Sequence, residues 1–208
     1  SKNTCLLKRC VVPDHRVIIV GTDGSETSIR AVEKAAGLAA ESNARLVVAS
    51  AYQADHHPSG APDPDQPRDE RYRTTGNAPV YDLLRDASSR ARKAGAHDVE
   101  ERAVEGAPAD ALVALAEELD ADLLVVGTIF PTGSHPGGVT AGPELISEIR
   151  DATEIPILAI GGIDDTNIQQ VMAAGAGGAA VITAISRRPD PESAARTLLS
   201  LMSKRDDN

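Results

Sequence analysis

The sequence predicts an α/β protein in which helices cover a parallel β-sheet. Short runs of Val, Ile and Leu alternate with Ala-rich segments of helical spacing. Aromatic residues are nearly absent, with one Phe, three Tyr and no Trp, so the core must be built from aliphatic side chains. A chain of 208 residues is long enough for one large domain or two small ones.

The first part of the chain contains four of the expected strands. We predict strands at residues 16–21, 44–51, 98–104 and 121–127. We predict helices at about residues 25–42, 81–94 and 108–119. Ser25 suits the N-cap of the first helix, and Pro108 suits the first turn of the third. Residues 53–77 are rich in Pro, Asp, His and Gly, which is typical of a loop.

The later part adds two short apolar runs, at residues 156–160 and 179–182, and both are predicted strands. Helices are expected between the loop after Gly127 and the strand at residues 156–160, after Asn167, and from residue 191 to about residue 204. The resulting alternation of six strands with six helices indicates right-handed parallel crossovers. Alternation alone does not choose between an open doubly wound sheet and a closed barrel.

Both of these later strands end in backbone that suits a phosphate group. One runs into Gly161-Gly162, where no Cβ stands between the backbone N–H groups and an anion. The other ends at Ile182 and Thr183, where the start of a helix would add free N–H groups and a favourable dipole. Two such ends side by side indicate a phosphate or pyrophosphate pocket. A simple tight turn explains Gly161-Gly162 equally well.

Composition and charge exclude several kinds of partner. A net charge of −10 disfavours nucleic acid and anionic membranes, which attract basic surfaces. No apolar run approaches the ~20 residues of a membrane span, and residues 1–9 lack the apolar core of a signal peptide. Cys5 and Cys10 are interpreted as reduced thiols, with a disulfide as the minor alternative. We therefore expect a cytoplasmic protein.

Several polar residues have both a functional and a structural interpretation. Asp23 is the best polar candidate for a ligand contact, and an Asx-turn after the first strand is the alternative. Asp164-Asp165 would meet Mg²⁺ beside a phosphate, but an N-cap for the helix after Asn167 is favoured. His56-His57 could bind a metal, but solvated side chains are favoured in a loop of this composition. No catalytic set is apparent.

Five segments of the first part together carry a resemblance to a known family. They are residues 20–25, 31–40, 47–52, 104–108 and 121–127. With these segments, residues 16–127 resemble a universal stress protein of the small, nucleotide-binding actinobacterial kind. The resemblance implies an open sheet that binds ATP or cyclic AMP at its strand ends. The nucleotide-binding residues that it implies are Thr22, Asp23, Ala51 and Gly127. Asp23 would face the ribose or adenine, and Ala51 would offer its backbone to the base.

The phosphate loop of that family is incomplete in this chain. The family pattern is a Gly, two residues, a second Gly, nine residues, and then Gly-Ser or Gly-Thr. Gly127 matches the first glycine, but Phe130 stands at the second and Thr140-Ala141 at the final pair. The triphosphate cradle that the family implies is therefore missing.

From Gly127 onward, other segments carry a second resemblance. They are residues 127–137, 142–145, 155–163, 174–178 and 181–185. With these segments the later part resembles the C-terminal part of thiamine-phosphate synthase and its thiazole tautomerase relatives, which are TIM barrels. In that family, Thr132, Ser134 and His135 would line the pyrophosphate or thiazole side of the pocket. The residues that would bind the thiazole phosphate are Gly161, Gly162, Ile182 and Thr183.

The two resemblances meet at residues 121–127, which can serve as a strand in either family. The chain therefore resembles a chimera, natural or engineered. We expect a lead-in at residues 1–15, a stress-protein part at 16–127 and a synthase-like part at 127–208, joined in one domain. If the first part keeps its family order, the strands run 3-2-1-4-5-6, and a crevice opens between strands 1 and 4. This open sheet is favoured over a closed barrel.

These features favour a protein that binds a nucleotide or a small phosphate ester, without evident catalysis. Enzyme activity of the thiamine-phosphate synthase or tautomerase type is the alternative. The synthase half with the pyrimidine site and metal-binding carboxylates has no counterpart here, so an enzyme is not favoured. The ligands considered are ATP, cyclic AMP and a thiazole phosphate, with Mg²⁺ as an option. A homodimer is an option too, although the strand through which such stress proteins pair is absent.

Overall fold

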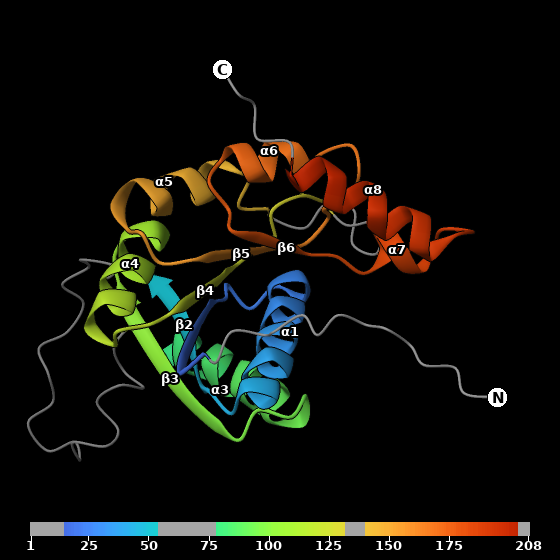
Figure 1. Ribbon diagram of the computed structural model, residues 1–208. Coiled ribbons are helices and arrows are strands. Elements are labelled where there is room, and N and C mark those ends of the chain that lie inside the picture. Colours follow the sequence, from blue (N-terminus) through green and yellow to red (C-terminus); the bar gives the residue numbers. More distant parts are fainter. Residues whose placement is uncertain (1–14, 54–77, 132–139, 204–208) are drawn as a thin grey trace, which may run out of the picture.

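The structure is a computed structural model that describes residues 15–53, 78–131 and 140–203. Its centre is a six-stranded, all-parallel sheet with the order β3-β2-β1-β4-β5-β6 (Figure 1). The strands are β1 (Val17–Gly21), β2 (Arg45–Tyr52), β3 (Asp98–Glu105), β4 (Leu123–Val126), β5 (Ile157–Ile160) and β6 (Gly178–Ala180). The predicted doubly wound sheet and its strand order are confirmed, and the described strands do not close into a barrel.

Helices cover both faces of the sheet, so the fold has three layers. The helices are α1 (Glu26–Ser42), α3 (Ala78–Lys93), α4 (Pro108–Glu118), α5 (Glu144–Ala152), α6 (Ile168–Ala173), α7 (Thr183–Ser186) and α8 (Pro191–Ser203). One face carries α1 and α3, and the other carries α4, α5 and α6, with α8 against α6 (Figure 1). In the described residues, no helix is long and apolar enough to cross a membrane.

The first helix begins and ends where local chemistry dictates. Ser25 is its N-cap, as predicted, and the Ser25 hydroxyl accepts a hydrogen bond from the Ser28 N–H at 3.2 Å. At the other end, Asn43 takes the left-handed conformation that commonly stops a helix. Between these ends, apolar positions such as Val32 and Ala36 are fully buried against the sheet. The helix is thereby fixed beside the ends of β1 and β4.

The central strand β4 joins the two parts of the sheet. It pairs with β1 through Leu124 and Ile19, and with β5 through Leu124 and Ile157. All four residues of β4 are buried. Beyond β4, the Ile129 N–H donates to the Ile160 carbonyl at 3.0 Å, so the loops after β4 and β5 remain in contact. The stress-protein part and the synthase-like part of the chain therefore form one continuous sheet.

The last strand is shorter than the sequence indicates. We predicted a strand over residues 179–182, but β6 ends at Ala180. The strand has a neighbour on one side only, so no second ladder holds Val181 and Ile182 in the sheet. The following helix α7 has only four residues, so the dipole expected to begin at Thr183 is not formed to a useful extent.

A prediction follows from the contact between β4 and β5. A Cβ added at Gly127 would lie 2.2 Å from the Ile160 carbonyl oxygen, so Gly127→Ala must separate the two strand ends. We expect this variant to lower the free energy of unfolding by about 3 kcal/mol. Gly37 is the control, because its Cβ would meet nothing within 4 Å on α1. Gly37→Ala should raise stability by up to about 1 kcal/mol through helix propensity. Urea unfolding measures both, and equal effects would contradict the close contact.

Candidate functional site

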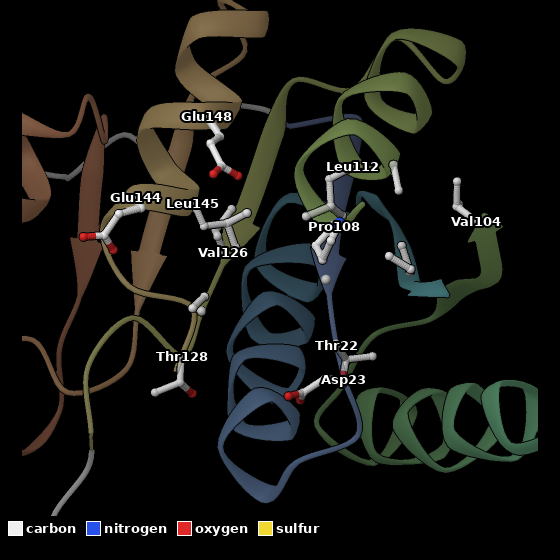
Figure 2. A pocket seen from close by; sticks show the side chains of 16 residues that line it. Thr22, Asp23, Val104, Pro108, Leu112, Val126, Thr128, Glu144, Leu145 and Glu148 are labelled. Atoms are coloured by element: carbon white, nitrogen blue, oxygen red, sulfur yellow. The ribbon is translucent and has the colours of Figure 1, made fainter. Parts of the chain in front are cut away.

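The first cavity lies over the carboxyl ends of β1, β2 and β4, between α4 and α5. Its volume is about 420 Å³. Figure 2 shows Leu112 and Pro108 of α4 on one side, with Leu145 of α5 and Val126 of β4 opposite. Apolar walls of this kind suit a flat organic group such as a nucleobase. The cavity occupies the crevice expected where the winding direction of the sheet reverses, between β1 and β4.

All four residues proposed for nucleotide contact line this cavity. They are Thr22, Asp23, Ala51 and Gly127. Thr22 and Asp23 directly follow β1, Ala51 is near the end of β2, and Gly127 directly follows β4. Three different parallel strands therefore bring these residues to one edge of the sheet. The apolar residues from α4 and α5 were missed, because their spacing did not distinguish a cavity wall from an ordinary core face.

The charged side chains of the first cavity are all acidic. Glu144 and Glu148 line it from α5, and Asp23 lines it from the turn after β1 (Figure 2). No Lys, Arg or His is among its described lining residues. Carboxylates repel a phosphate but accept hydrogen bonds from hydroxyl and amino groups. The cavity is therefore suited to the sugar and base of a nucleotide rather than to its phosphates.

Asp23 forms the Asx-turn that the sequence offered as an alternative to ligand contact. Its Oδ1 accepts a hydrogen bond from the Ser25 N–H at 3.0 Å. Partial burial works to raise the pKa of Asp23, but hydrogen bonds from Ser25 and Ser28 outweigh it and hold the pKa below its ordinary value. The carboxylate is exposed and lines the cavity as well. The structural and functional roles are therefore compatible.

A second cavity, of about 460 Å³, lies at the ends of β5 and β6. Four residues predicted to bind phosphate line it together: Gly161, Gly162, Ile182 and Thr183. The two strand ends thus lie side by side, as the sequence indicated. Thr128 lines both cavities and lies between them.

Gly161 and Gly162 form a tight turn and leave backbone N–H available for hydrogen bonding. Gly161 and Gly162 have φ values of 97° and 66°, which side chains rarely adopt. A Cβ on Gly162 would lie 2.3 Å from the Phe130 carbonyl oxygen, so the tight-turn interpretation is correct. Within the described residues, the N–H groups of Gly162 and Thr183 donate no hydrogen bond, so they are available to an anion.

Cationic side chains complete the second cavity. Arg30 and Lys34 come from α1, and Arg187 and Arg188 follow α7. Arg188 forms an ion pair with Asp165. These four residues were not predicted, because their convergence depends on the packing of α1 near β5 and β6. The only available signal was the i, i+4 spacing of Arg30 and Lys34, which places both on one helix face.

The turn that leads into α6 holds the glycine pair in place. The Asn167 side chain donates to the Gly162 carbonyl at 2.9 Å and accepts from the Asp164 N–H at 2.9 Å. Asp164 accepts from Thr166, and this hydrogen bond is the main reason that the pKa of Asp164 is lowered. The expected N-cap at Asp164-Asp165 needs correction, because Asn167 occupies that position and Asp164 stabilises the preceding turn.

Some predicted residues lie outside the described part of the chain. Thr132, Ser134 and His135 fall in the gap between residues 131 and 140, and His56-His57 fall between residues 53 and 78. Elsewhere, within residues 15–53, 78–131 and 140–203, no three His, Cys, Asp or Glu side chains form a group that could hold a metal ion.

The Asp23 turn generates a prediction about pH. Because its pKa is lowered on folding, charged Asp23 stabilises the protein above the ordinary value of 3.8, and this contribution is lost as the pH falls through the lowered pKa. Asp23→Asn keeps a turn acceptor but removes the charge. It should lower the free energy of unfolding by about 0.5 kcal/mol at pH 7, since water screens an exposed carboxylate. Urea unfolding at pH 7 and pH 3 should show the difference shrinking in acid. A constant difference would contradict the charge effect.

Comparison with known proteins finds two families, whose matches overlap at residues 106–130. The model of the universal stress protein family matches residues 15–130, and the model of thiamine monophosphate synthase matches residues 106–185. The thiamine-phosphate synthase of Methanospirillum hungatei is 49% identical over 89 residues, which are 42% of this chain and 43% of the synthase. The chain thus spans less than half the length of that synthase.

The relatives of the first part are matched over more of their length. A universal stress protein of Mycobacterium tuberculosis strain H37Rv is 51% identical over 115 residues, which are 55% of this chain and 77% of that protein. The crystal structure of a universal stress protein in complex with cAMP has a TM-score of 0.52 at 36% identity, and covers 72% of this chain and 98% of that chain. The chain belongs to the universal stress protein family, and its later part is similar to thiamine-phosphate synthase.

Proposed function

We propose that this protein binds a nucleotide or a related phosphate ester at the carboxyl edge of its sheet. The observation that carries the proposal is the apolar cavity between α4 and α5, which has acidic residues on its wall and a second, basic cavity beside it. The nucleoside part of the ligand occupies the first cavity. Its phosphates extend past Thr128 toward the second cavity.

The contacts expected for the nucleoside follow from the lining of the first cavity. The base packs between Leu112 and Leu145, and Ala51 offers its backbone to the edge of the base. The carboxylate of Asp23 accepts hydrogen bonds from the ribose hydroxyls. A related universal stress protein has been solved in complex with cAMP, and this supports an adenine nucleotide as the ligand.

The phosphate arrangement differs from the one that the family pattern implies. Phe130 and Thr140-Ala141 replace the glycine and the Gly-Ser or Gly-Thr pair of the family loop. The open N–H groups of Gly162 and Thr183 offer another place for the phosphates. ATP and cyclic AMP are the ligands of choice, and Mg²⁺ would enter with the phosphates of ATP. We expect the protein to act in the cytoplasm.

A second candidate is an activity of the thiamine-phosphate synthase or thiazole tautomerase type. It is favoured by the convergence of Gly161, Gly162, Ile182 and Thr183 on one cavity, since that family would use these positions for a thiazole phosphate. The chain spans 43% of one such synthase, so a whole active site would need further residues. Mg²⁺-dependent release of pyrophosphate from the pyrimidine and thiazole substrates tests this candidate. If the protein binds neither nucleotides nor thiazole phosphate, it is a hybrid without a selected ligand.

Filling the first cavity tests the proposed nucleotide site. Ala51→Leu adds a branched side chain to the cavity wall and should weaken adenosine and cyclic AMP binding at least tenfold by steric exclusion. Ala152→Leu is the matched control, because Ala152 is exposed at the end of α5 and does not line the cavity. Isothermal titration calorimetry measures both variants. Equal affinities in wild type and Ala51→Leu would place the nucleoside elsewhere.

A further inference from the structure

We infer that the second cavity is a composite anion site, assembled from α1 and from the synthase-like segment, that takes a multiply charged phosphate. The synthase-like segment supplies the backbone N–H groups together with Arg187 and Arg188, and α1 supplies Arg30 and Lys34. The inference rests on the proposed function in that it names where the phosphates of the ligand lie. It also predicts binding of free pyrophosphate, which needs no nucleoside in the first cavity.

The fold explains how α1 reaches the synthase-like segment. Helices α5 and α6 cover one face of β5 and β6, and in a TIM barrel all such helices form the outer ring. The opposite face of these strands would therefore point into the barrel. In this protein, Leu158, Ile160 and Ala180 of that face belong to the same apolar cluster as the buried side of α1. A helix of the stress-protein part thus stands where the interior of a barrel would be (Figure 1).

This arrangement turns one flank of α1 toward the glycine loop. Thr27, Arg30 and Lys34 lie along α1 at intervals of three and four residues, and all three line the second cavity. Gly161 and Gly162 line the same cavity from the loop after β5. Neither part of the chain would form this combination alone, since Arg30 and Lys34 precede β4, whereas the two glycines follow it.

The charges around the cavity give a positive excess. Four cations line it, and Asp164 is the one acidic side chain among its described lining residues. Arg188 is engaged by Asp165, so its charge is already offset. Lys34 and Arg187 are in no ion pair within the described residues. The chain as a whole has a net charge of −10, so this local positive excess is opposite in sign to the overall charge.

The chemistry of these groups selects a phosphate rather than a carboxylate or a neutral group. The open N–H groups of Gly162 and Thr183 can donate hydrogen bonds to phosphate oxygens at close range, because Gly162 carries no Cβ. Lys34 acts as a mobile point charge, and Arg187 can engage two oxygens at once. Several donors on more than one side match a tetrahedral group with several charged oxygens. A phosphate chain of two or three groups uses this cavity better than a single cyclic phosphate.

Calorimetry with ATP, pyrophosphate and adenosine tests the inference on the full chain. Lys34→Gln and Arg187→Gln should each weaken the binding of ATP and pyrophosphate about tenfold, because each variant loses a charge-assisted hydrogen bond to a phosphate oxygen. Both side chains are exposed, so neither change should disturb folding, and circular dichroism checks this. Lys93→Gln is the matched control, because it removes the same charge from α3 away from the cavity. Adenosine affinity should not change in any variant.

The outcomes separate this inference from the proposed function. Reduced ATP and pyrophosphate affinity in Lys34→Gln and Arg187→Gln, with Lys93→Gln unchanged, supports the composite site. If adenosine fails to bind while pyrophosphate still depends on Lys34 and Arg187, the proposed nucleotide function fails and the composite site stands. If all three lysine and arginine variants bind ATP and pyrophosphate like the wild type, or lose affinity equally, the composite site is wrong.

Discussion

The contact between the loops after β4 and β5 is the constraint on which the rest of the structure depends. Gly127 approaches the Ile160 carbonyl, Gly161 approaches Thr128, and Gly162 approaches the Phe130 carbonyl, each at a distance that a Cβ would prevent. Three glycines on two neighbouring strand ends therefore let the backbones of the two loops pack directly against each other. This contact joins the two parts of the sheet, and it also places Thr128 between the two cavities.

The same contact between the two loops explains how an acidic cavity and a basic cavity can lie next to each other. The cavity with Asp23, Glu144 and Glu148 opens on the α4 and α5 side, whereas the cavity with Lys34 and Arg187 opens beside α1. The strand ends and Thr128 separate them. A ligand that is neutral at one end and highly charged at the other fits this division. The phosphate site that we propose thus lies away from the family loop that Phe130 interrupts.

Much of this arrangement could be predicted from the sequence, for reasons that differ between elements. The strand order came from combining two family patterns at one shared strand, and the Ser25 cap from local chemistry alone. The glycine pair was identifiable because its conformational demand is local. The place of Lys34 beside the second cavity was not predictable, since it depends on which helix lies over β5 and β6. The early end of β6 was missed because an apolar run does not reveal whether its far side has a partner.

The short strand β6 has a consequence for the behaviour of the protein in concentrated solution. An open sheet normally risks adding strands from other molecules along its unpaired border. At the β6 edge only three residues present that border, and the chain turns away at Val181 into α7. A ladder this brief offers a neighbouring chain too few backbone hydrogen bonds to begin a fibre-like stack. The β6 edge of the sheet therefore discourages self-association through main-chain pairing.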